Sequence, residues 1–504
     1  MRNKPIIIAG AGIGGLSAAC LLAARGEEVL LIERQAAPGG KMRHINIDGA
    51  LIDGGPTVFT MRYIFDAIFA EAGTTLEAEL GLKPLSVLAR HSWGHGAELD
   101  LFADLKQSAD AIAQFAGPDE ANHFLSFQAE SRRVFNALKK PFIESQRPTP
   151  FSLATSSGIS GMLELMRINP FETLWSAVSR HFKDPRLRQL YGRYATYCGS
   201  SPFEAVATLM LIAHVEQDGV WSVEGGMHAV ARAFERVFLR LGGTIRYGLS
   251  VSDVELHHGS VSAIATSESE RIECSDLIIN ADVNAVASGL FGPSVQHAAR
   301  AVPAKARSLS AITWAAHLTT HGFPLEHHNV FFSSDYKKEF DELATGYPSD
   351  PTVYICAQDR TEKVDGPERL LILVNSPANG DDAPQAHQKI EMAMRLKLAH
   401  CGLKIDWDDT RIVTTPPSGF ADLFPATGGA IYGRASHGWL ASFQRAAAKT
   451  KIPGLYLAGG SAHPGPGVPM AAMSGRLAAE SLMVQRVSTR KFHRGAITGG
   501  ISMR

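Results

Sequence analysis

The chain has 504 residues, of which 45% are apolar and 20% are charged. This length exceeds that of one ordinary domain, so we expect two or three units with buried cores. A formal net charge of −1 offers no concentrated basic face, and we therefore expect no nucleic-acid partner. The five cysteines are scattered without a CxxC spacing. They predict reduced, mostly buried thiols and no metal site.

The segment 6–33 carries the strongest local pattern. A short β-branched run leads into three glycines and an apolar helical stretch, and the apolar strand that follows ends at Glu33. This order is typical of a βαβ unit that binds a dinucleotide. Gly10 permits a tight turn, Gly12 lets the backbone approach a pyrophosphate, and Gly15 lets helix and strand pack closely.

Glu33 indicates which dinucleotide the unit prefers. A carboxylate after the second strand accepts hydrogen bonds from ribose hydroxyls, and its charge repels a 2′-phosphate. The free N–H groups at the N-terminus of the helix favour the phosphates of the ligand. We therefore expect a dinucleotide of the FAD or NAD type rather than NADP.

The uncharged run at 6–24 also resembles a signal peptide or a membrane-spanning helix, because it follows Arg2 and Lys4. Its cluster of glycines argues against a spanning helix, and no good cleavage site precedes Glu27. The run also leads almost directly into another strand. We therefore expect a cytoplasmic protein.

A second glycine-rich segment follows the βαβ unit and includes Gly39-Gly40-Lys41 and Asp53 to Thr57. With these residues the chain resembles the flavoproteins of the amine oxidase and carotenoid desaturase superfamily, which have two dinucleotide-binding domains. The resemblance implies an α/β fold with a Rossmann-like FAD domain and a mixed-sheet and helical substrate domain. It further implies that this segment closes over the FAD pyrophosphate and flavin. The residues concerned are Gly40, Lys41, Gly55, Pro56 and Thr57.

The last glycine-rich segment lies between a predicted strand at 455–458 and a helix of small residues. Its Gly459-Gly460 pair and the helix start at Val468, Pro469 and Met470 would face the flavin. A helix N-terminus stabilises negative charge that develops on a reduced flavin. Many superfamily members carry an acid after this strand, and its replacement by glycines disfavours an amine oxidase.

The resemblance also implies that the FAD domain is discontinuous. It implies backbone contact between Val251 and the adenine. We expect a hairpin at 86–105, helices at 108–190 and a sheet-rich part at 300–420. The expected boundaries are 1–85, 220–292 and 440–484 for the FAD-binding domain, 86–219 and 293–439 for the substrate domain, and 485–504 for a basic tail.

Several residues in the expected substrate domain leave two interpretations open. The tyrosines Tyr191, Tyr194 and Tyr197 recur every third residue, which is typical of either a packed aromatic stripe or the wall of a pocket for a flat ligand. Arg62 and Arg193 are either active-site residues or members of ion pairs. We expect the pair His327-His328 at a turn or the surface, with a structural role favoured over a catalytic one, and we assign no catalytic acid or base.

The central region narrows the resemblance to bacterial carotenoid desaturases, most closely the hydroxycarotenoid 3,4-desaturases, also called methoxyneurosporene dehydrogenases. The segments that carry this likeness are 54–62, 90–93, 184–202 and 210–217. The likeness implies FAD-dependent desaturation of a hydroxylated or methoxylated acyclic carotenoid, with oxygen or a quinone as electron acceptor. The alternatives are a phytoene desaturase, an amine or porphyrinogen oxidase, and a non-catalytic binder of the prenylated-protein chaperone type.

A carotenoid substrate dissolves in the bilayer, so we expect peripheral attachment of this chain to the inner membrane. The helical region 142–190 is the expected contact, and its stretch 151–174 is either core, which is favoured, or a lipid-facing surface. After Glu480 the chain has no acid, and its basic residues could bind anionic lipid or belong to a disordered tail. These residues are Arg486, Arg490, Lys491, Arg494 and Arg504.

Overall fold

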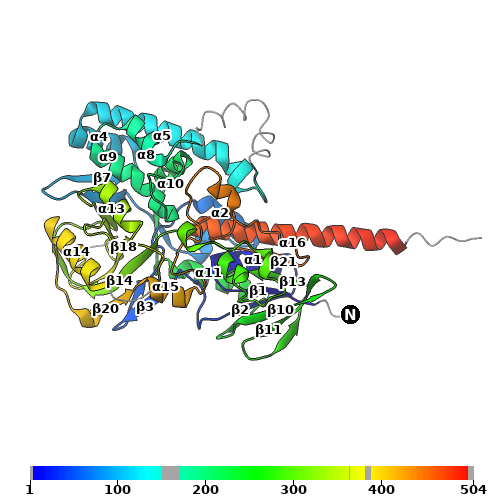
Figure 1. Cartoon of the computed structure of the whole chain (residues 1–504). Helices are drawn as coiled ribbons and strands as arrows, with labels where there is room; N and C mark the ends of the chain where they lie inside the picture. The colour runs from blue at the N-terminus through cyan, green and yellow to red at the C-terminus, as the bar shows by residue number, and fades with distance from the viewer. Residues whose placement is uncertain (1–3, 150–170, 362–363, 381–386, 498–504) are drawn as a thin grey trace, which may run out of the picture.

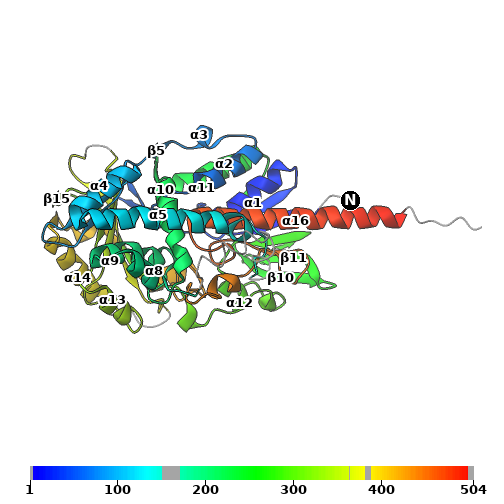
Figure 2. The same ribbon diagram turned by 90° about the horizontal axis from the view of Figure 1, so that it is seen from above.

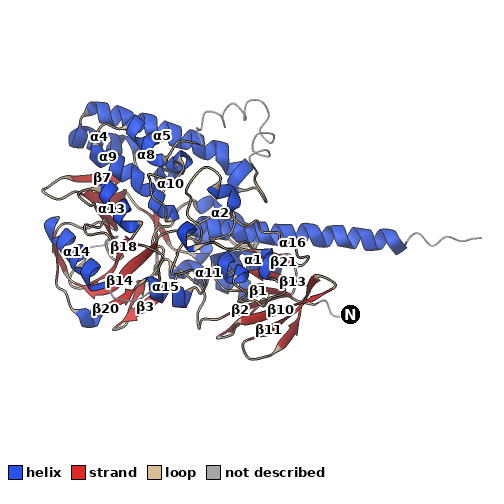
Figure 3. Cartoon of the chain, in the orientation of Figure 1, coloured by secondary structure: helices blue, strands red, loops and turns tan. Residues whose placement is uncertain are grey.

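The computed structural model describes residues 4–149, 171–361, 364–380 and 387–497. Figure 1 shows two main sheets side by side, with a layer of helices above them. The same division is visible by secondary structure in Figure 3. This arrangement matches the predicted α/β fold with a mixed sheet and helical part.

The first sheet is five-stranded, and all of its strands run parallel. Its central strands are uninterrupted apolar runs, because both faces of a parallel sheet are covered. The β1 strand is buried along its whole length. In spatial order the strands are β21 (Leu455–Leu457), β13 (Asp276–Ile279), β1 (Ile6–Ala9), β2 (Val29–Glu33) and β9 (Thr244–Tyr247).

Three helices pack around this sheet: α1 (Ile13–Ala24), α11 (His228–Arg240) and α16 (Val468–Ile497). The helices α1 and α16 approach each other closely, since a Cβ on Gly475 would lie only 1.9 Å from the carbonyl oxygen of Gly14. The Ser17 hydroxyl also donates to the carbonyl of Ala472 at 2.9 Å. Small residues on both helices therefore bring their N-terminal turns together.

The second sheet has seven strands and is mixed. The hairpin of β6 and β7 joins it through parallel pairing of β6 with β16, whereas the other neighbours are antiparallel. In spatial order the strands are β20 (Ile412–Thr415), β14 (Ser310–Leu318), β18 (Glu368–Ser376), β17 (Val353–Ala357), β16 (His328–Phe331), β6 (Val87–Ser92) and β7 (Glu98–Phe102).

The helical layer shares one apolar core with part of the second sheet. Aromatic side chains fill this core, including Phe124, Phe127 and Phe182, which are fully buried. Figure 2 shows the layer from above. Its helices are α4 (Leu105–Ala116), α5 (Pro118–Leu138), α8 (Leu174–His181), α9 (Pro185–Gly192) and α10 (Leu211–Asp218).

Smaller elements complete the described chain. The antiparallel strands β10 (Val251–His257), β11 (Ser260–Thr266) and β12 (Arg271–Glu273) form a sheet of their own, which leads into β13. Two-stranded pairs are β3 (His44–Ile47) with β4 (Ala50–Asp53), β5 (Leu82–Pro84) with β8 (Trp221–Val223), and β15 (Thr320–Gly322) with β19 (Leu403–Ile405). The other α-helices are α2 (Arg62–Glu71), α3 (Leu76–Glu79), α12 (Val283–Ala287), α13 (Tyr336–Leu343), α14 (His387–His400) and α15 (Pro417–Leu423).

The C-terminal part differs from the expected separate tail. The helix α16 continues without interruption to Ile497, and Figure 1 shows it projecting beyond the body of the protein. Arg486 is held by Asp276, with its Nε 3.0 Å from the carboxylate, and by Glu27. These ion pairs hold this part of α16 against the FAD-type sheet. Among the described residues, no helix is long and apolar enough to cross a membrane.

Glu339 on α13 provides a pH-dependent test of the packing between α13 and β17. Its carboxylate accepts from the backbone N–H of Thr352 at 2.9 Å and from the Thr352 hydroxyl at 2.7 Å. Burial nevertheless raises the pKa of Glu339 from 4.5 to about 7. Between these values the folded chain binds more protons than the unfolded chain, so stability falls as pH rises.

We predict that Glu339→Gln removes this part of the pH dependence, worth about 3 kcal/mol at 1.36 kcal/mol per pKa unit. Thermal unfolding midpoints at pH 5 and pH 7.5 measure it. Glu342→Gln, on the exposed face of the same helix, should keep the wild-type slope in this window because the hydrogen bond from the Ser349 backbone lowers the pKa of Glu342. An unchanged slope in Glu339→Gln would contradict the prediction.

Candidate functional site

A single cavity of ≈ 1910 Å³ is lined by residues from both main sheets and the helical layer. Pockets for one drug-sized ligand measure about 300–1,000 Å³. The cavity therefore has room for two large ligands placed end to end or face to face. All of the predicted cofactor residues except Gly15 line it.

The first glycine loop forms one wall of this cavity. Gly10 has a φ of +104°, which favours glycine because a side chain would be strained there. A Cβ on Gly15 would lie 2.1 Å from the carbonyl oxygen of Gly10, so Gly15 stands behind the loop and lets α1 pack against it. Gly12 lines the cavity and pairs with Gly39 in an isolated parallel bridge.

Asn280 positions this glycine loop, and the sequence analysis did not identify its role. Its side-chain amide donates to the carbonyl of Gly10 at 3.1 Å, and its backbone N–H donates to Ala9 at 2.8 Å. A Cβ on Gly12 would lie 2.8 Å from the Asn280 amide nitrogen. The only available sequence signal was its place directly after a buried parallel strand, at the edge where such sheets bind ligands.

Glu33 ends β2 beside the same loop and is 7% exposed. One carboxylate oxygen accepts from the backbone N–H of Ala11 at 2.6 Å, and the other accepts from that of Gln35 at 2.8 Å. A carboxylate oxygen has more than one lone pair, so each can accept a further hydrogen bond from a ligand. Val251, at the start of β10, lines the same cavity.

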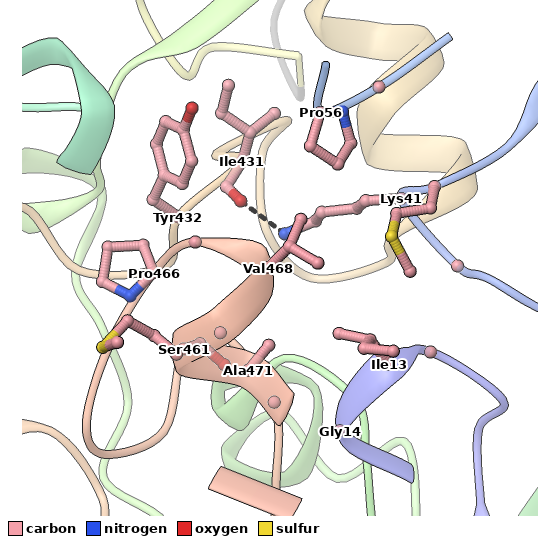
Figure 4. Close-up of a pocket in the computed structure, with 18 of the residues that line it drawn as sticks. Ile13, Gly14, Lys41, Pro56, Ile431, Tyr432, Ser461, Pro466, Val468 and Ala471 are labelled. Atoms are coloured by element: carbon pink, nitrogen blue, oxygen red, sulfur yellow. Dashed lines mark hydrogen bonds between the residues drawn. The ribbon is translucent and has the colours of Figure 1, made fainter. Parts of the chain in front are cut away.

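Lys41 extends into the middle of the cavity (Figure 4). Its ammonium donates to the carbonyl oxygen of Ile431 at 2.5 Å. Burial lowers the pKa of Lys41, and Asp282 opposes this effect. The loop of Gly55 and Pro56 packs tightly on this segment, since a Cβ on Gly55 would lie 1.8 Å from the Lys41 carbonyl oxygen.

Two helix N-termini meet in this region. Figure 4 shows Val468 and Ala471 at the start of α16 near Ile13 and Gly14 at the start of α1. Gly12, the N-cap of α1, contributes no side-chain hydrogen bond to the first turn. The free N–H groups and the dipoles of helix N-termini are suited to phosphate and to other negative charge. The glycine cradle and the uncapped helix therefore fit a dinucleotide pyrophosphate.

The helical layer contributes a buried polar cluster to the other part of the cavity, where Arg193 and Glu216 are 7% and 8% exposed. The Tyr194 hydroxyl donates to one carboxylate oxygen of Glu216 at 2.6 Å, and the Tyr197 hydroxyl donates to the other. Burial alone would lower the pKa of Arg193, but Tyr197 and Glu216 raise it overall. The guanidinium therefore stays charged inside the protein.

The two interpretations of the tyrosine repeat both apply, to different members. Residues Arg193–Cys198 form a 3-10 helix rather than an α-helix, and side chains three residues apart are aligned in such a helix. Tyr191 and Tyr194 belong to the buried aromatic core, whereas Tyr197 lines the cavity. The other arginine, Arg62, is outside the cavity wall and pairs with Asp66 at 3.1 Å.

His328 is not at the surface, which corrects the sequence prediction for this residue, whereas His327 lies at a bend before β16 and is partly exposed. His328 lies in β16 and is 3% exposed, because the seven-stranded sheet covers it. Its Nδ1 is 2.7 Å from the Tyr354 hydroxyl, which is 2.7 Å from the hydroxyl of Thr57. Burial lowers the pKa of His327 to about 4 and that of His328 well below 6.5. Both imidazoles are therefore neutral at physiological pH.

Three side chains in and beside this sheet lie close enough together to hold a metal ion. The donor atoms of His327, His328 and Cys356 are within 4.8 Å of one another, and they form the one such group of three among the residues that the structure describes. None of the three lines the cavity. All five cysteines are buried and unbridged, as the sequence predicts.

Comparison with known proteins places this architecture in a family. The family described as "flavin containing amine oxidoreductase" matches residues 13–483. A hydroxyneurosporene desaturase of Rubrivivax gelatinosus is 52% identical over 513 residues, covering 100% of this chain and 98% of the relative. Another, from Cereibacter sphaeroides, is 41% identical over 490 residues, covering 96% and 98%.

The solved structure of wild-type putrescine oxidase bound to putrescine has a TM-score of 0.60 to this chain at 16% identity. The match covers 96% of this chain and 99% of that one, and at this identity it shows the fold alone. The predicted flavoprotein fold and the FAD cofactor are confirmed. The chain belongs to the flavin containing amine oxidoreductase family and, within it, to the carotenoid desaturases.

Proposed function

We propose that this protein is an FAD-dependent desaturase that introduces a C–C double bond into a hydroxylated or methoxylated acyclic carotenoid. The observation that carries the proposal is one cavity that continues from the glycine loop of the parallel sheet to the polar cluster of the helical layer. The names of the two relatives described above support this substrate class. Oxygen or a quinone is the proposed electron acceptor.

We propose that the cavity residues identified from the sequence hold FAD. Glu33 and Val251 are placed for the adenosine end, and the first turn of α1 for the pyrophosphate. Gly15 acts by packing behind the loop. The proposed set is Gly10, Gly12, Gly15, Glu33, Gly40, Lys41, Gly55, Pro56, Thr57, Val251, Gly459, Gly460, Val468, Pro469 and Met470.

When bound, FAD supplies the acceptor for the hydride that desaturation removes. The chain's own task is to orient an unpolarised substrate, since fixed geometry can contribute several kcal/mol to a reaction of this kind. Apolar side chains such as Leu209, Ile212 and Leu373 line the cavity and exclude water. We assign no catalytic base, because a polyene delocalises positive charge and the neutral His328 is not on the cavity wall.

We also propose peripheral attachment to the inner membrane, with the cavity opening toward the lipid. Phe171 and Trp439 line the cavity and yet are 73% and 40% exposed, and their rings lie 5.3 Å apart. The neighbouring Leu440 is 41% exposed. Exposed aromatic residues of this kind are enriched at membrane interfaces. Residues 151–170 of the predicted contact region lie outside the described residues.

The basic C-terminal segment contributes less to this attachment than its sequence suggests. Arg486 is engaged with Asp276 and Glu27 and is therefore unavailable to lipid headgroups. The side chains of Arg490, Lys491 and Arg494 and the whole of Arg504 fall outside the described part of the chain.

We predict that Gly12→Val weakens FAD binding by at least about tenfold, because core overpacking costs 1–3 kcal/mol and 1.4 kcal/mol is tenfold. A Cβ at this position would lie 2.8 Å from the Asn280 amide nitrogen and would therefore displace the loop that lines the cavity. Flavin absorbance per protein after gel filtration measures the effect. Gly346→Ala is the matched control, since a Cβ there meets nothing within 4 Å. Full flavin content in Gly12→Val would show that the pyrophosphate does not bind at this loop.

The substrate class is tested by incubating the FAD-loaded protein with each carotenoid in membranes and recording the polyene absorption. We expect the spectrum to shift to longer wavelength with hydroxyneurosporene and to stay largely unchanged with phytoene. Conversion of phytoene without action on hydroxyneurosporene would instead identify a phytoene desaturase.

Membrane attachment is tested by flotation with anionic liposomes at low salt. We expect the double variant Phe171→Ser/Trp439→Ser to float less than the wild type, because it removes the exposed aromatic pair. The control Met392→Ser/Leu396→Ser changes two side chains on α14 that are 66% and 65% exposed but do not line the cavity. Equal flotation of both variants and wild type would exclude the aromatic pair as the anchor.

A further inference from the structure

We propose that Arg193 recognises the oxygen substituent of the carotenoid and thereby selects hydroxylated and methoxylated substrates over hydrocarbons. This inference rests on the proposed function and adds the residue that determines specificity. Arg193 is a buried cation on the wall of a largely apolar cavity, and not all of its donors make hydrogen bonds to the described residues.

Arg193 has donors to spare in the cavity. It is 7% exposed and lines the wall. Its Nη2 donates to the Tyr197 hydroxyl over 3.4 Å, a long hydrogen bond, and its Nη1 makes no hydrogen bond among the described residues. Burying an unsatisfied donor of a charged group costs free energy. An acceptor brought in by a ligand would remove that cost.

Glu216 does not accept a hydrogen bond from Arg193. Its two carboxylate oxygens are occupied by the hydroxyls of Tyr194 and Tyr197. No ion pair joins Arg193 and Glu216 among the residues that the structure describes, because the Tyr197 hydroxyl bonds to both side chains. The carboxylate balances the buried charge from a distance, and the guanidinium keeps donors free for a ligand.

The donor chemistry of arginine matches both substrate types. A guanidinium has five N–H donors and no acceptor. A hydroxyl oxygen and a methoxyl oxygen both accept hydrogen bonds, whereas the unsubstituted end of a hydrocarbon cannot. A carboxylate would recognise only the hydroxyl, since a methoxyl group has no proton to donate. One arginine therefore accounts for acceptance of both oxygenated substrates and rejection of their parent hydrocarbon.

Arg193 also lies near the proposed flavin segment. The Tyr354 hydroxyl is 2.7 Å from the hydroxyl of Thr57, which is among the proposed FAD contacts. Arg193, Tyr354 and Thr57 line the same cavity. Burial raises the pKa of Tyr354, and the charge of Arg193 opposes this effect. Desaturation next to the oxygenated end requires the oxygen anchor to share the space in which the flavin lies.

A second polar group strengthens the assignment. The Tyr336 hydroxyl is buried and has no hydrogen-bond partner among the described residues, and Tyr336 lines the same cavity. Arg193 is also an electrostatic neighbour of Tyr336. Arg193 and Tyr336 therefore place two polar side chains on the wall of one largely apolar cavity.

The test compares kcat/KM for three substrates: hydroxyneurosporene, methoxyneurosporene and neurosporene, which lacks the oxygen. The main variant is Arg193→Met/Glu216→Gln, which removes both buried charges together and leaves an amide oxygen for the two tyrosines. Arg193→Lys keeps a charged donor. Arg62→Met, which removes an arginine outside the cavity, is the matched control. FAD content and the dissociation constant of each carotenoid are measured on every protein.

We expect the wild type and Arg62→Met to prefer both oxygenated substrates. In the double variant the preference should fall by about 10- to 100-fold, the range expected for one hydrogen bond to a charged donor. Both oxygenated substrates should lose affinity to the same extent, while neurosporene and FAD bind as before. Arg193→Lys should show an intermediate preference.

Other outcomes would overturn the inference. An unchanged preference in the double variant, or in Arg193→Met alone if the double variant fails to retain FAD, would show that Arg193 has only a structural role. A loss of affinity confined to hydroxyneurosporene would show that a hydrogen-bond acceptor, and not Arg193, recognises the substrate. A wild type that ignores both oxygenated substrates would refute the proposed function itself, and the inference with it.

Discussion

The fold depends on close contacts that glycines make with neighbouring backbone atoms at the centre of the parallel sheet. Gly10, Gly14 and Gly475 each stand where a Cβ would overlap a neighbouring backbone oxygen, and Asn280 fills the space between the glycine loop and Gly459. Dispersion and hydrogen bonds at such short range require that no side chain intervenes. As a result the N-terminal turns of α1 and α16 converge, although their sequences lie more than four hundred residues apart.

This convergence determines where chemistry can take place. The N-termini of these two helices create a region of positive potential at the carboxyl edge of the sheet. The helical layer and the seven-stranded sheet close the opposite side, so that the region opens into a cavity and not into bulk water. In the low-dielectric part of that cavity a single buried charge, Arg193, has a much larger effect on ligand choice than it would at the surface. In the proposed function, the parallel sheet binds the cofactor and the helical layer selects the substrate, and both line one cavity.

Tertiary packing changed the meaning of several sequence patterns. The tyrosine repeat resembled one helical face, but Tyr191 lies in the last turn of α9 and in the core, whereas Tyr197 lies in the 3-10 helix that follows and on the cavity wall. The His327-His328 pair looked like a turn, but only His327 lies at a bend, and His328 begins a strand within the second sheet. The basic residues after 484 suggested a separate tail, yet α16 continues through them and Arg486 is bound by two acids.

The sequence by itself determined the dinucleotide unit, the flavin family and the residues of the glycine loops. These features can be recognised locally, because the glycine spacing and the acid that mark such a unit lie within one βαβ segment, although the atoms that exclude a side chain at Gly10 and Gly12 come from Asn280. Only the tertiary structure identified Asn280, the Arg193 cluster and the exposed pair of Phe171 and Trp439. Their roles depend on partners brought together from distant strands and helices, and no spacing along the chain records which distant side chains meet inside a cavity or at its mouth.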